Sequence, residues 1–267
     1  MSLRVRSSAP DAEGRVLAIT PESAGWKYVG LEVRRLTADQ AVSLTSAGKE
    51  VCILILTGTA DVQTGDRAFP GLGGRKTVFE DAPPGAVYAP PGSAIHIQAC
   101  SDCEVALCSA PGTAAGEARA IPGERMPQEI RGEGNNRRMV RNVLPETEPA
   151  ERLLVVEVIT PGGHWSSYPP HKHDTDTPPA ETQLEETYYH RLNPPQGFAF
   201  QRVYTDDRSI DETVCVEDGD VVLVPRGYHP VGAPHGYDLY YLNVMAGPVR
   251  HWIVRDDPAH AWIKRRR

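Results

Sequence analysis

The sequence predicts an all-β protein built from two tandem antiparallel β-domains, and three observations support this prediction. First, the 267 residues include 24 glycines and 24 prolines. This is about half as much again as average usage and leaves little room for long helices. Second, short segments rich in Val, Ile, Leu and Tyr recur along the chain, whereas helical periodicity is almost absent. Third, a pattern of turn, strand and Pro-x-Gly occurs once in each half of the chain.

Apolar segments of strand length follow one another in both halves, separated by turn residues. In the first half they are 51–56, 85–89, 94–97 and 104–108. In the second half they are 153–160, 187–190, 198–204, 221–224 and 239–244. Strands of this length and spacing are typical of antiparallel sandwiches and barrels.

A polar, glycine-rich stretch at 132–138 separates the halves and is interpreted as a linker or an exposed loop. We therefore expect an amino-terminal domain at 1–130 and a carboxy-terminal domain at 131–267. The halves echo each other, because segments 81–92 and 217–227 both combine a turn, a short apolar strand and Pro-x-Gly, with a histidine shortly afterwards. Two copies of one β-fold explain this echo most simply.

Charge and composition exclude several classes of protein. The formal net charge is −7, which argues against a general nucleic-acid binder, and the basic residues 264–267 are interpreted as a solvated chain end. No apolar run approaches the ~18 residues that a membrane-spanning helix needs, and residues 1–8 contain no apolar signal core. Five cysteines, an odd number, do not make a disulfide framework. We therefore expect a cytoplasmic protein with no nucleic-acid or membrane partner.

The strongest chemical signal is His171-Lys172-His173. Side chains alternate along a strand, so a His-x-His pair directs both imidazoles to one face, where they can bind one metal ion. A carboxylate and a third imidazole from neighbouring strands would complete such a site. The candidates for these two positions are Glu185 or Glu186 and, further along the chain, His229.

This arrangement resembles the two sequence motifs of the cupin family. The first motif contains glycine, His-x-His and a later glutamate, and the second is Gly-x5-Pro-x-Gly followed by histidine. Gly219, Pro225 and Gly227 match the second motif residue by residue. There are two departures: His229 follows Gly227 by two positions instead of three, and a long insert precedes the glutamates. Glu186 is preferred as the ligand, because Glu-Thr-Tyr-Tyr resembles the start of a cupin strand.

Longer segments resemble the 5-deoxy-glucuronate isomerase family of myo-inositol breakdown, which is related to isomerases of 4-deoxy-uronates. These segments are 161–174, 184–190, 196–204 and 227–231. The resemblance implies a bicupin, two jelly-roll-like β-barrels in tandem, with one divalent metal in the second barrel. The implied ligands are His171, His173, Glu186 and His229. Zinc is the first expectation, with manganese, iron and nickel as alternatives, since the ligand types do not choose among them.

The resemblance further implies an aldose–ketose isomerase that converts 5-deoxy-D-glucuronate into 5-dehydro-2-deoxy-D-gluconate through an enediol. Proton transfer is expected from Glu185, Tyr188 or His190, which the sequence does not rank. We expect Arg202 to bind the carboxylate of the sugar acid, because a planar guanidinium suits bidentate binding. Tyr241 is expected to offer its hydroxyl to the sugar. No nucleotide, nicotinamide or flavin is required.

The first domain has no His-x-His pair, so we expect it to bind no metal. Its role would be structural, including a subunit interface in a homo-oligomer. His96, which follows the Pro-x-Gly of this half, is expected to be a packed or hydrogen-bonded core side chain.

Two other functions are compatible with the same ligands. The first is a metal-dependent dioxygenase, since cupins with three histidines and one glutamate also activate oxygen. The second is a sugar-binding cupin without catalytic activity. Oxygen uptake would distinguish a dioxygenase from an isomerase. Turnover of a sugar substrate would distinguish an isomerase from a sugar-binding cupin without catalytic activity.

Overall fold

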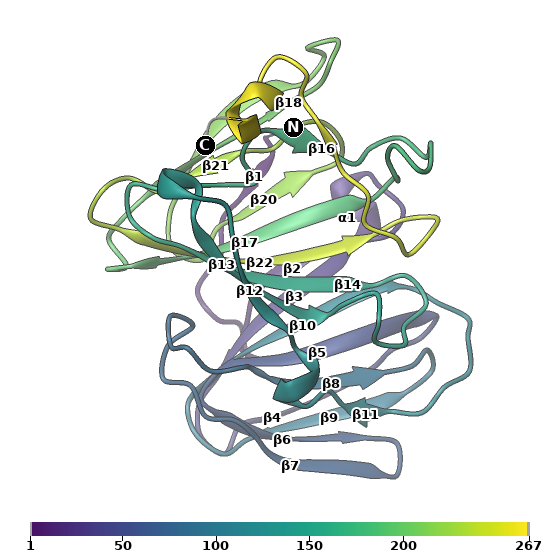
Figure 1. The fold of residues 1–267 in the computed structure, drawn as a ribbon. Helices are drawn as coiled ribbons and strands as arrows, with labels where there is room; N and C mark the ends of the chain where they lie inside the picture. The colour runs from purple at the N-terminus through teal and green to yellow at the C-terminus, as the bar shows by residue number, and fades with distance from the viewer. Residues whose placement is uncertain (1, 266–267) are drawn as a thin grey trace. The chain divides into compact units, whose positions relative to one another are not determined.

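The computed structural model describes residues 2–265, and these residues form mainly β-strands (Figure 1). The α-helix α1 (Pro21–Ala24) is one turn long, and the 3₁₀ turns are Gly123–Arg125, Gly134–Asn136 and Ala261–Arg265. The all-β prediction is therefore confirmed. Within residues 2–265, none of the helices has the length and apolar character needed to cross a membrane.

The chain folds into two compact units, which are described separately. The first consists of Met1–Arg6, Gln128–Val140 and Glu157–Arg267, and the second of Ser7–Pro127 and Arg141–Val156. The division expected from the sequence, 1–130 and 131–267, stays a prediction, since each unit draws on residues from both sides of position 130.

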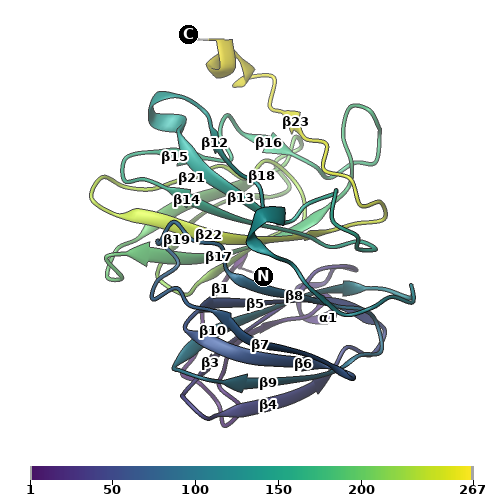
Figure 2. The same ribbon diagram turned by 60° about the horizontal axis from the view of Figure 1, so that its bottom comes forward.

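Two antiparallel sheets make up the unit that contains most of the amino-terminal half. The larger has the order β11-β8-β5-β10-β3-β2. Its strands are β11 (Arg119–Ala120), β8 (Gly85–Ala89), β5 (Lys49–Thr57), β10 (Cys103–Pro111), β3 (Gly30–Leu36) and β2 (Arg15–Ile19). The smaller sheet has the order β4-β9-β6-β7, and its four strands are labelled in the lower part of Figure 2. Its strands are β4 (Ala41–Thr45), β9 (Ala94–Ala99), β6 (Thr59–Thr64) and β7 (Arg67–Gly73).

Apolar side chains fill the space between these two sheets. Ile53 and Ile55 of β5, Val62 of β6 and Ile97 of β9 are at most 1% exposed and belong to one cluster. Because strand side chains alternate, His96 points away from this cluster and lies on the exposed face. It shares a 2.9 Å hydrogen bond with Ser43 Oγ, so the expected polar partner exists, but the expected core position is wrong.

The other unit contains a seven-stranded sheet and two smaller ones. The large sheet has the order β1-β20-β17-β22-β14-β13-β12, and two of its strands, β13 and β14, also contribute residues to the amino-terminal unit. Its strands are β1 (Arg4–Val5), β20 (Val221–Val224), β17 (Glu185–Asn193), β22 (Asp238–Ala246), β14 (Leu154–Thr160), β13 (Arg138–Leu144) and β12 (Gln128–Arg131).

The two smaller sheets carry several of the residues that the sequence marked. The four-stranded sheet consists of β15 (Trp165–Ser166), β21 (Val231–Gly232), β18 (Ala199–Tyr204) and β19 (Asp211–Val216), in that order. The two-stranded sheet pairs β16 (His171–Lys172) with β23 (Arg255–Asp256). The chain between β23 and the last 3₁₀ turn is visible at the yellow end of Figure 2.

Candidate metal centre

Three buried side chains from distant parts of the sequence meet in the carboxy-terminal unit. His173, Glu186 and His229 are each at most 2% exposed, and one ligand atom of each lies within 4.8 Å of the others. Glu186 Oε2 is 3.1 Å from His173 Nε2 and 3.3 Å from His229 Nε2. His229 Nε2 is buried and has no hydrogen-bond partner among the described residues. Two imidazoles and a carboxylate thus converge on one point, as they do around a bound cation.

His171 lies beside this group. Its ring centroid is 5.0 Å from that of His229, the same separation as between His173 and His229. Burial lowers the pKa of His171 well below the usual value, and the nearby His229 and His173 lower it further. A neutral imidazole is the form that binds a metal, so the position and the protonation state of His171 both suit a fourth ligand.

Strand alternation and one tight turn bring these residues together. In β17, Glu186, Tyr188 and His190 share one face, because successive strand residues point to opposite sides. His229 follows Gly227, which has a φ of +94°. A Cβ at Gly227 would lie 2.4 Å from Tyr204 O, so glycine is required for the turn that directs His229 inward.

Backbone carbonyls fix the orientation of two of the rings. His173 Nδ1 is 3.1 Å from Leu184 O, and His229 Nδ1 is 2.8 Å from Gly227 O. An N–H at each Nδ1 would leave the Nε2 lone pair available to a metal ion beside Glu186, an arrangement common around metal-binding histidines. Burial lowers the pKa of His229 to about 4. For His173, burial acts in the same direction, but the hydrogen bond and charge of Glu186 outweigh it and raise the pKa.

A buried ionic network connects the two histidine-bearing segments. Lys172, only 5% exposed, donates to Asp174 over 2.5 Å and to Glu181 over 3.3 Å. The other carboxylate oxygen of Asp174 accepts a 2.8 Å bond from the backbone N–H of Gly227. Because Gly227 in turn accepts from His229, this network holds the turn before His229 against the strand that contains His171.

Hydroxyl groups gather next to the histidines. Tyr188 OH is 2.8 Å from Ser167 Oγ, and Tyr241 OH is 2.5 Å from Ser166 Oγ. The Tyr188 ring lies 4.8 Å from the Tyr241 ring and 5.8 Å from the His229 ring. Burial raises the pKa of both tyrosines, so they are neutral near pH 7 and can donate hydrogen bonds.

His190 lies further along β17, behind Tyr188. Its ring stacks on the Tyr188 ring at 5.9 Å, and His190 Nε2 is 3.0 Å from Gln201 Oε1. His190 Nδ1 is buried with no hydrogen-bond partner among residues 2–265. Burial lowers the pKa of His190 to about 4, so this side chain is neutral at pH 7.

The buried His190 predicts a loss of stability in acid. In the unfolded chain its pKa is near 6.5, so between pH 6.5 and about 4 the unfolded state binds a proton that the folded state does not. The free energy of unfolding should therefore fall by roughly 2 kcal/mol from this residue between pH 7 and pH 5. Urea denaturation of the metal-free protein at both pH values checks this. His190→Gln, which keeps a donor for Gln201, should show a smaller fall, and equal falls in both proteins would contradict the prediction.

Two residues expected at the site lie elsewhere. Glu185 is on the face of β17 opposite to Glu186, where it is buried. Arg202 is on the outer face of β18, with a side chain 42% exposed and bonds of 2.8 and 2.9 Å to the carboxylate of Asp211. The inward position next to it belongs to Gln201. The structure thus places these two residues away from the group that the other predicted site residues form.

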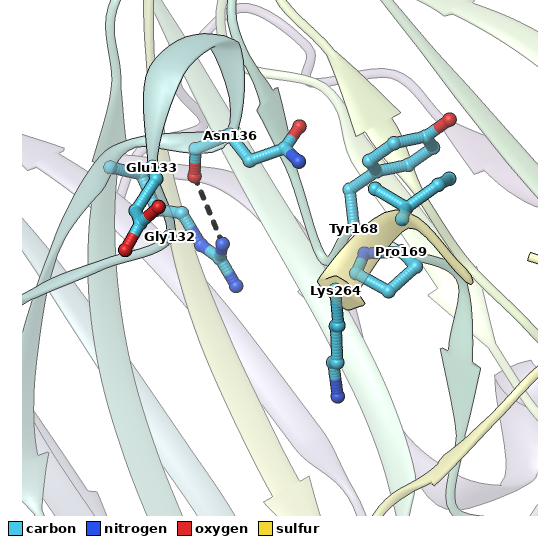
Figure 3. A pocket seen from close by; sticks show the side chains of 8 residues that line it. Gly132, Glu133, Asn136, Tyr168, Pro169 and Lys264 are labelled. Carbon is cyan, nitrogen blue, oxygen red and sulfur yellow. Dashed lines mark hydrogen bonds between the residues drawn. The ribbon is translucent and has the colours of Figure 1, made fainter. Parts of the chain in front are cut away.

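Sequence reasoning missed a cavity of about 400 Å³, lined in part by Tyr168 and Pro169, which precede His171 in the chain. Figure 3 shows Glu133 and Asn136 on one side of it and Tyr168, Pro169 and Lys264 on the other. Arg138 also lines it, although the sequence predicts a linker or exposed loop at 132–138. Arg138 is the first residue of β13, and no local sequence signal marks it as a site residue.

Comparison with known proteins agrees with this architecture. The chain is similar to a 5-deoxy-glucuronate isomerase of Geobacillus thermodenitrificans, with 54% identity over 97% of this chain and 94% of the relative. A protein of the same name from Bacillus subtilis strain 168 is 49% identical over 93% of this chain and 92% of its own length.

Solved structures support the fold. An IolB-like protein from Salmonella typhimurium matches 99% of this chain and 100% of its own, with a TM-score of 0.96 and 47% identity. Oxalate decarboxylase from Bacillus subtilis matches 95% of this chain and 78% of its own, with a TM-score of 0.66 and 15% identity. The second likeness concerns the fold alone and confirms the bicupin prediction. The model of the KduI/IolB family matches residues 3–263. The chain therefore belongs to the KduI/IolB family and is an isomerase.

Proposed function

We propose that this isomerase converts 5-deoxy-D-glucuronate into 5-dehydro-2-deoxy-D-gluconate, a step of myo-inositol degradation, with one divalent metal bound by His171, His173, Glu186 and His229. The observation that carries the proposal is the convergence of buried imidazoles on one carboxylate, with His229 Nε2 left without a hydrogen-bond partner among the described residues. The names of the relatives supply the substrate. We further propose zinc as the metal, with manganese, iron and nickel as alternatives, because three nitrogens and one carboxylate suit all four.

The donor set fits a catalytic cation. Such a cation supplies Lewis acidity, which stabilises negative charge on the carbonyl and hydroxyl oxygens of the sugar. The isomerisation moves one proton from C2 to C1 and one from the C2 hydroxyl to the aldehyde oxygen, so atoms and electrons balance without an oxidant. The charge of a divalent cation at this buried site would be balanced in part by one carboxylate. The three histidines would bind it as neutral imidazoles, kept neutral by burial or by the ion.

Tyr188 is the best-placed group for proton transfer among the three that the sequence left open. Its ring is next to His229, and Ser167 holds its hydroxyl. As a neutral phenol it can give a proton to an oxygen of the sugar, and Ser167 offers a path for returning one. We assign His190 the role of supporting the Tyr188 ring and Tyr241 that of binding a sugar hydroxyl.

For the amino-terminal unit we propose a structural role and subunit contacts in a homo-oligomer. Apolar side chains occupy the space between its two sheets, which leaves little room there for polar metal ligands. We also propose that the enzyme acts in the cytoplasm, and the five cysteines, all free, are compatible with a reducing compartment.

Removal of the metal is expected to abolish isomerisation. Protein treated with a chelator and then desalted should convert 5-deoxy-D-glucuronate no faster than buffer in an NMR assay, and zinc, manganese, iron(II) or nickel should restore the rate. The rate should be the same in anaerobic buffer, since no oxidant takes part. Undiminished turnover by chelated protein would contradict the metal dependence, and oxygen uptake would favour a dioxygenase instead.

A further inference from the structure

The cavity lined by Tyr168 and Pro169 contains the guanidinium of Arg138, which forms no ion pair with any of the described residues. Arg138 opens β13 and is half-buried, and its Nη1 donates a 3.0 Å bond to Asn136 O, the dashed line in Figure 3. Among the described residues, no carboxylate lies within ion-pair distance of Arg138, and Glu133, which lines the same cavity, forms no ion pair with it. Burial lowers the pKa of Arg138, which reflects the loss of water around its charge. An anion in the cavity would offset that loss.

Arg138 lines the same cavity as the segment that leads to His171. Tyr168 and Pro169 line the cavity, and His171 follows Pro169 by two residues. A volume of about 400 Å³ falls in the range of small-molecule sites. The cavity is therefore large enough to hold a sugar acid.

The other cation of the cavity is less suited to bind an anion. Lys264 Nζ lies 2.6 and 2.8 Å from the two carboxylate oxygens of Asp256, so its charge is already paired. Its side chain is 55% exposed, and water screens such a charge. The guanidinium of Arg138, by contrast, is planar, partly desolvated and able to form two parallel hydrogen bonds with a carboxylate.

We propose that Arg138 binds the carboxylate of the sugar acid and thereby selects uronates over neutral sugars. This inference rests on the proposed function for the identity of the substrate. It replaces the role that the sequence suggested for Arg202, whose guanidinium already forms a bidentate pair with Asp211 on the outer face of β18.

The test compares acids with their amides in three proteins: wild type, Arg138→Met and Arg138→Lys. Loss of a charge-assisted bidentate pair should raise KM for 5-deoxy-D-glucuronate about 100-fold in Arg138→Met, with a smaller change in kcat. KM for 5-deoxy-D-glucuronamide, which has no charge, should be nearly unchanged. Arg138→Lys should restore part of the preference for the acid. Arg67→Met removes an exposed arginine of the amino-terminal unit and serves as the control.

Calorimetry with D-glucuronate as the probe separates this inference from the proposed function. Wild type should bind D-glucuronate about 100-fold more tightly than Arg138→Met does, while both bind D-glucuronamide equally weakly. If wild type fails to isomerise 5-deoxy-D-glucuronate but still binds D-glucuronate more tightly than Arg138→Met does, the proposed function is wrong and the anion site is supported. If Arg138→Met retains wild-type affinity for D-glucuronate, or wild type does not bind it, the inference is wrong whatever the enzyme turns over. The inference would also be wrong if Arg202→Met lost the preference for acids over amides while Arg138→Met kept it.

Discussion

Replacing His229 with alanine is expected to leave the protein without its metal and to lower kcat/KM by about 1000-fold or more, since a cation contributes several kcal/mol to charge stabilisation. His229 Nε2 is 3.3 Å from Glu186 Oε2, its ring is 5.0 Å from the rings of both His171 and His173, and its Nδ1 is oriented by Gly227 O. Its removal takes one imidazole from the centre of the group. Metal content per chain and NMR turnover of 5-deoxy-D-glucuronate measure the two effects.

His171→Ala is expected to give the same two losses. The matched control is His96→Ala, which removes an exposed histidine that is bonded to Ser43 in the amino-terminal unit. The control should retain both metal and activity, and all three variants should keep the β-sheet circular dichroism spectrum of wild type. A metal-loaded, fully active His229→Ala protein would show that His229 is not a ligand.

Replacing Glu50 with alanine is expected to cost about 3–5 kcal/mol of unfolding free energy, the largest effect on stability that we predict. Glu50 is fully buried within the amino-terminal unit. It accepts bonds of 2.6 to 2.8 Å from Tyr88 OH and from the backbone N–H groups of Glu151, Arg152 and Leu153. Alanine would leave these four donors without their acceptor.

Urea denaturation compares Glu50→Ala with Glu117→Ala, an exposed carboxylate of the same unit that pairs with Arg67. The exposed pair should contribute less than about 1 kcal/mol, so the control should unfold near the wild-type midpoint. Glu50→Gln should fall between the two, since the amide retains an acceptor but not the charge. A loss below about 1 kcal/mol in Glu50→Ala would mean that water or a shift of the backbone satisfies the four donors.

The candidate metal centre could be predicted largely because its ligands follow local rules. Alternation along one strand places Glu186, Tyr188 and His190 on a single face, and the tight turn at Gly227 needs glycine at that position. The same rule explains why Arg202 lies on the outer face of β18. The sequence placed an arginine on the correct strand but did not fix which face is buried, and the buried residue is Gln201.

Arg138 could not be predicted as a site residue, because its surroundings come from distant segments. Its cavity is built from the loop before β13, from Tyr168 and Pro169, and from residues 263–264 near the end of the chain. Nothing in the local pattern of 132–138 indicates these neighbours. Lys264, part of the basic run 264–267 that the sequence interprets as a solvated end, is exposed, and it also lines the cavity and pairs with Asp256. Residues 266–267 lie outside the described part of the chain.

An anomalous difference map from a crystal of the purified enzyme, recorded at the absorption edge of the metal that elemental analysis detects, tests the central claim most directly. The account predicts one peak per chain, about 2.1 Å from the Nε2 atoms of His171, His173 and His229 and bonded to a carboxylate oxygen of Glu186. A map without a peak there, from crystals that turn over 5-deoxy-D-glucuronate, would contradict it.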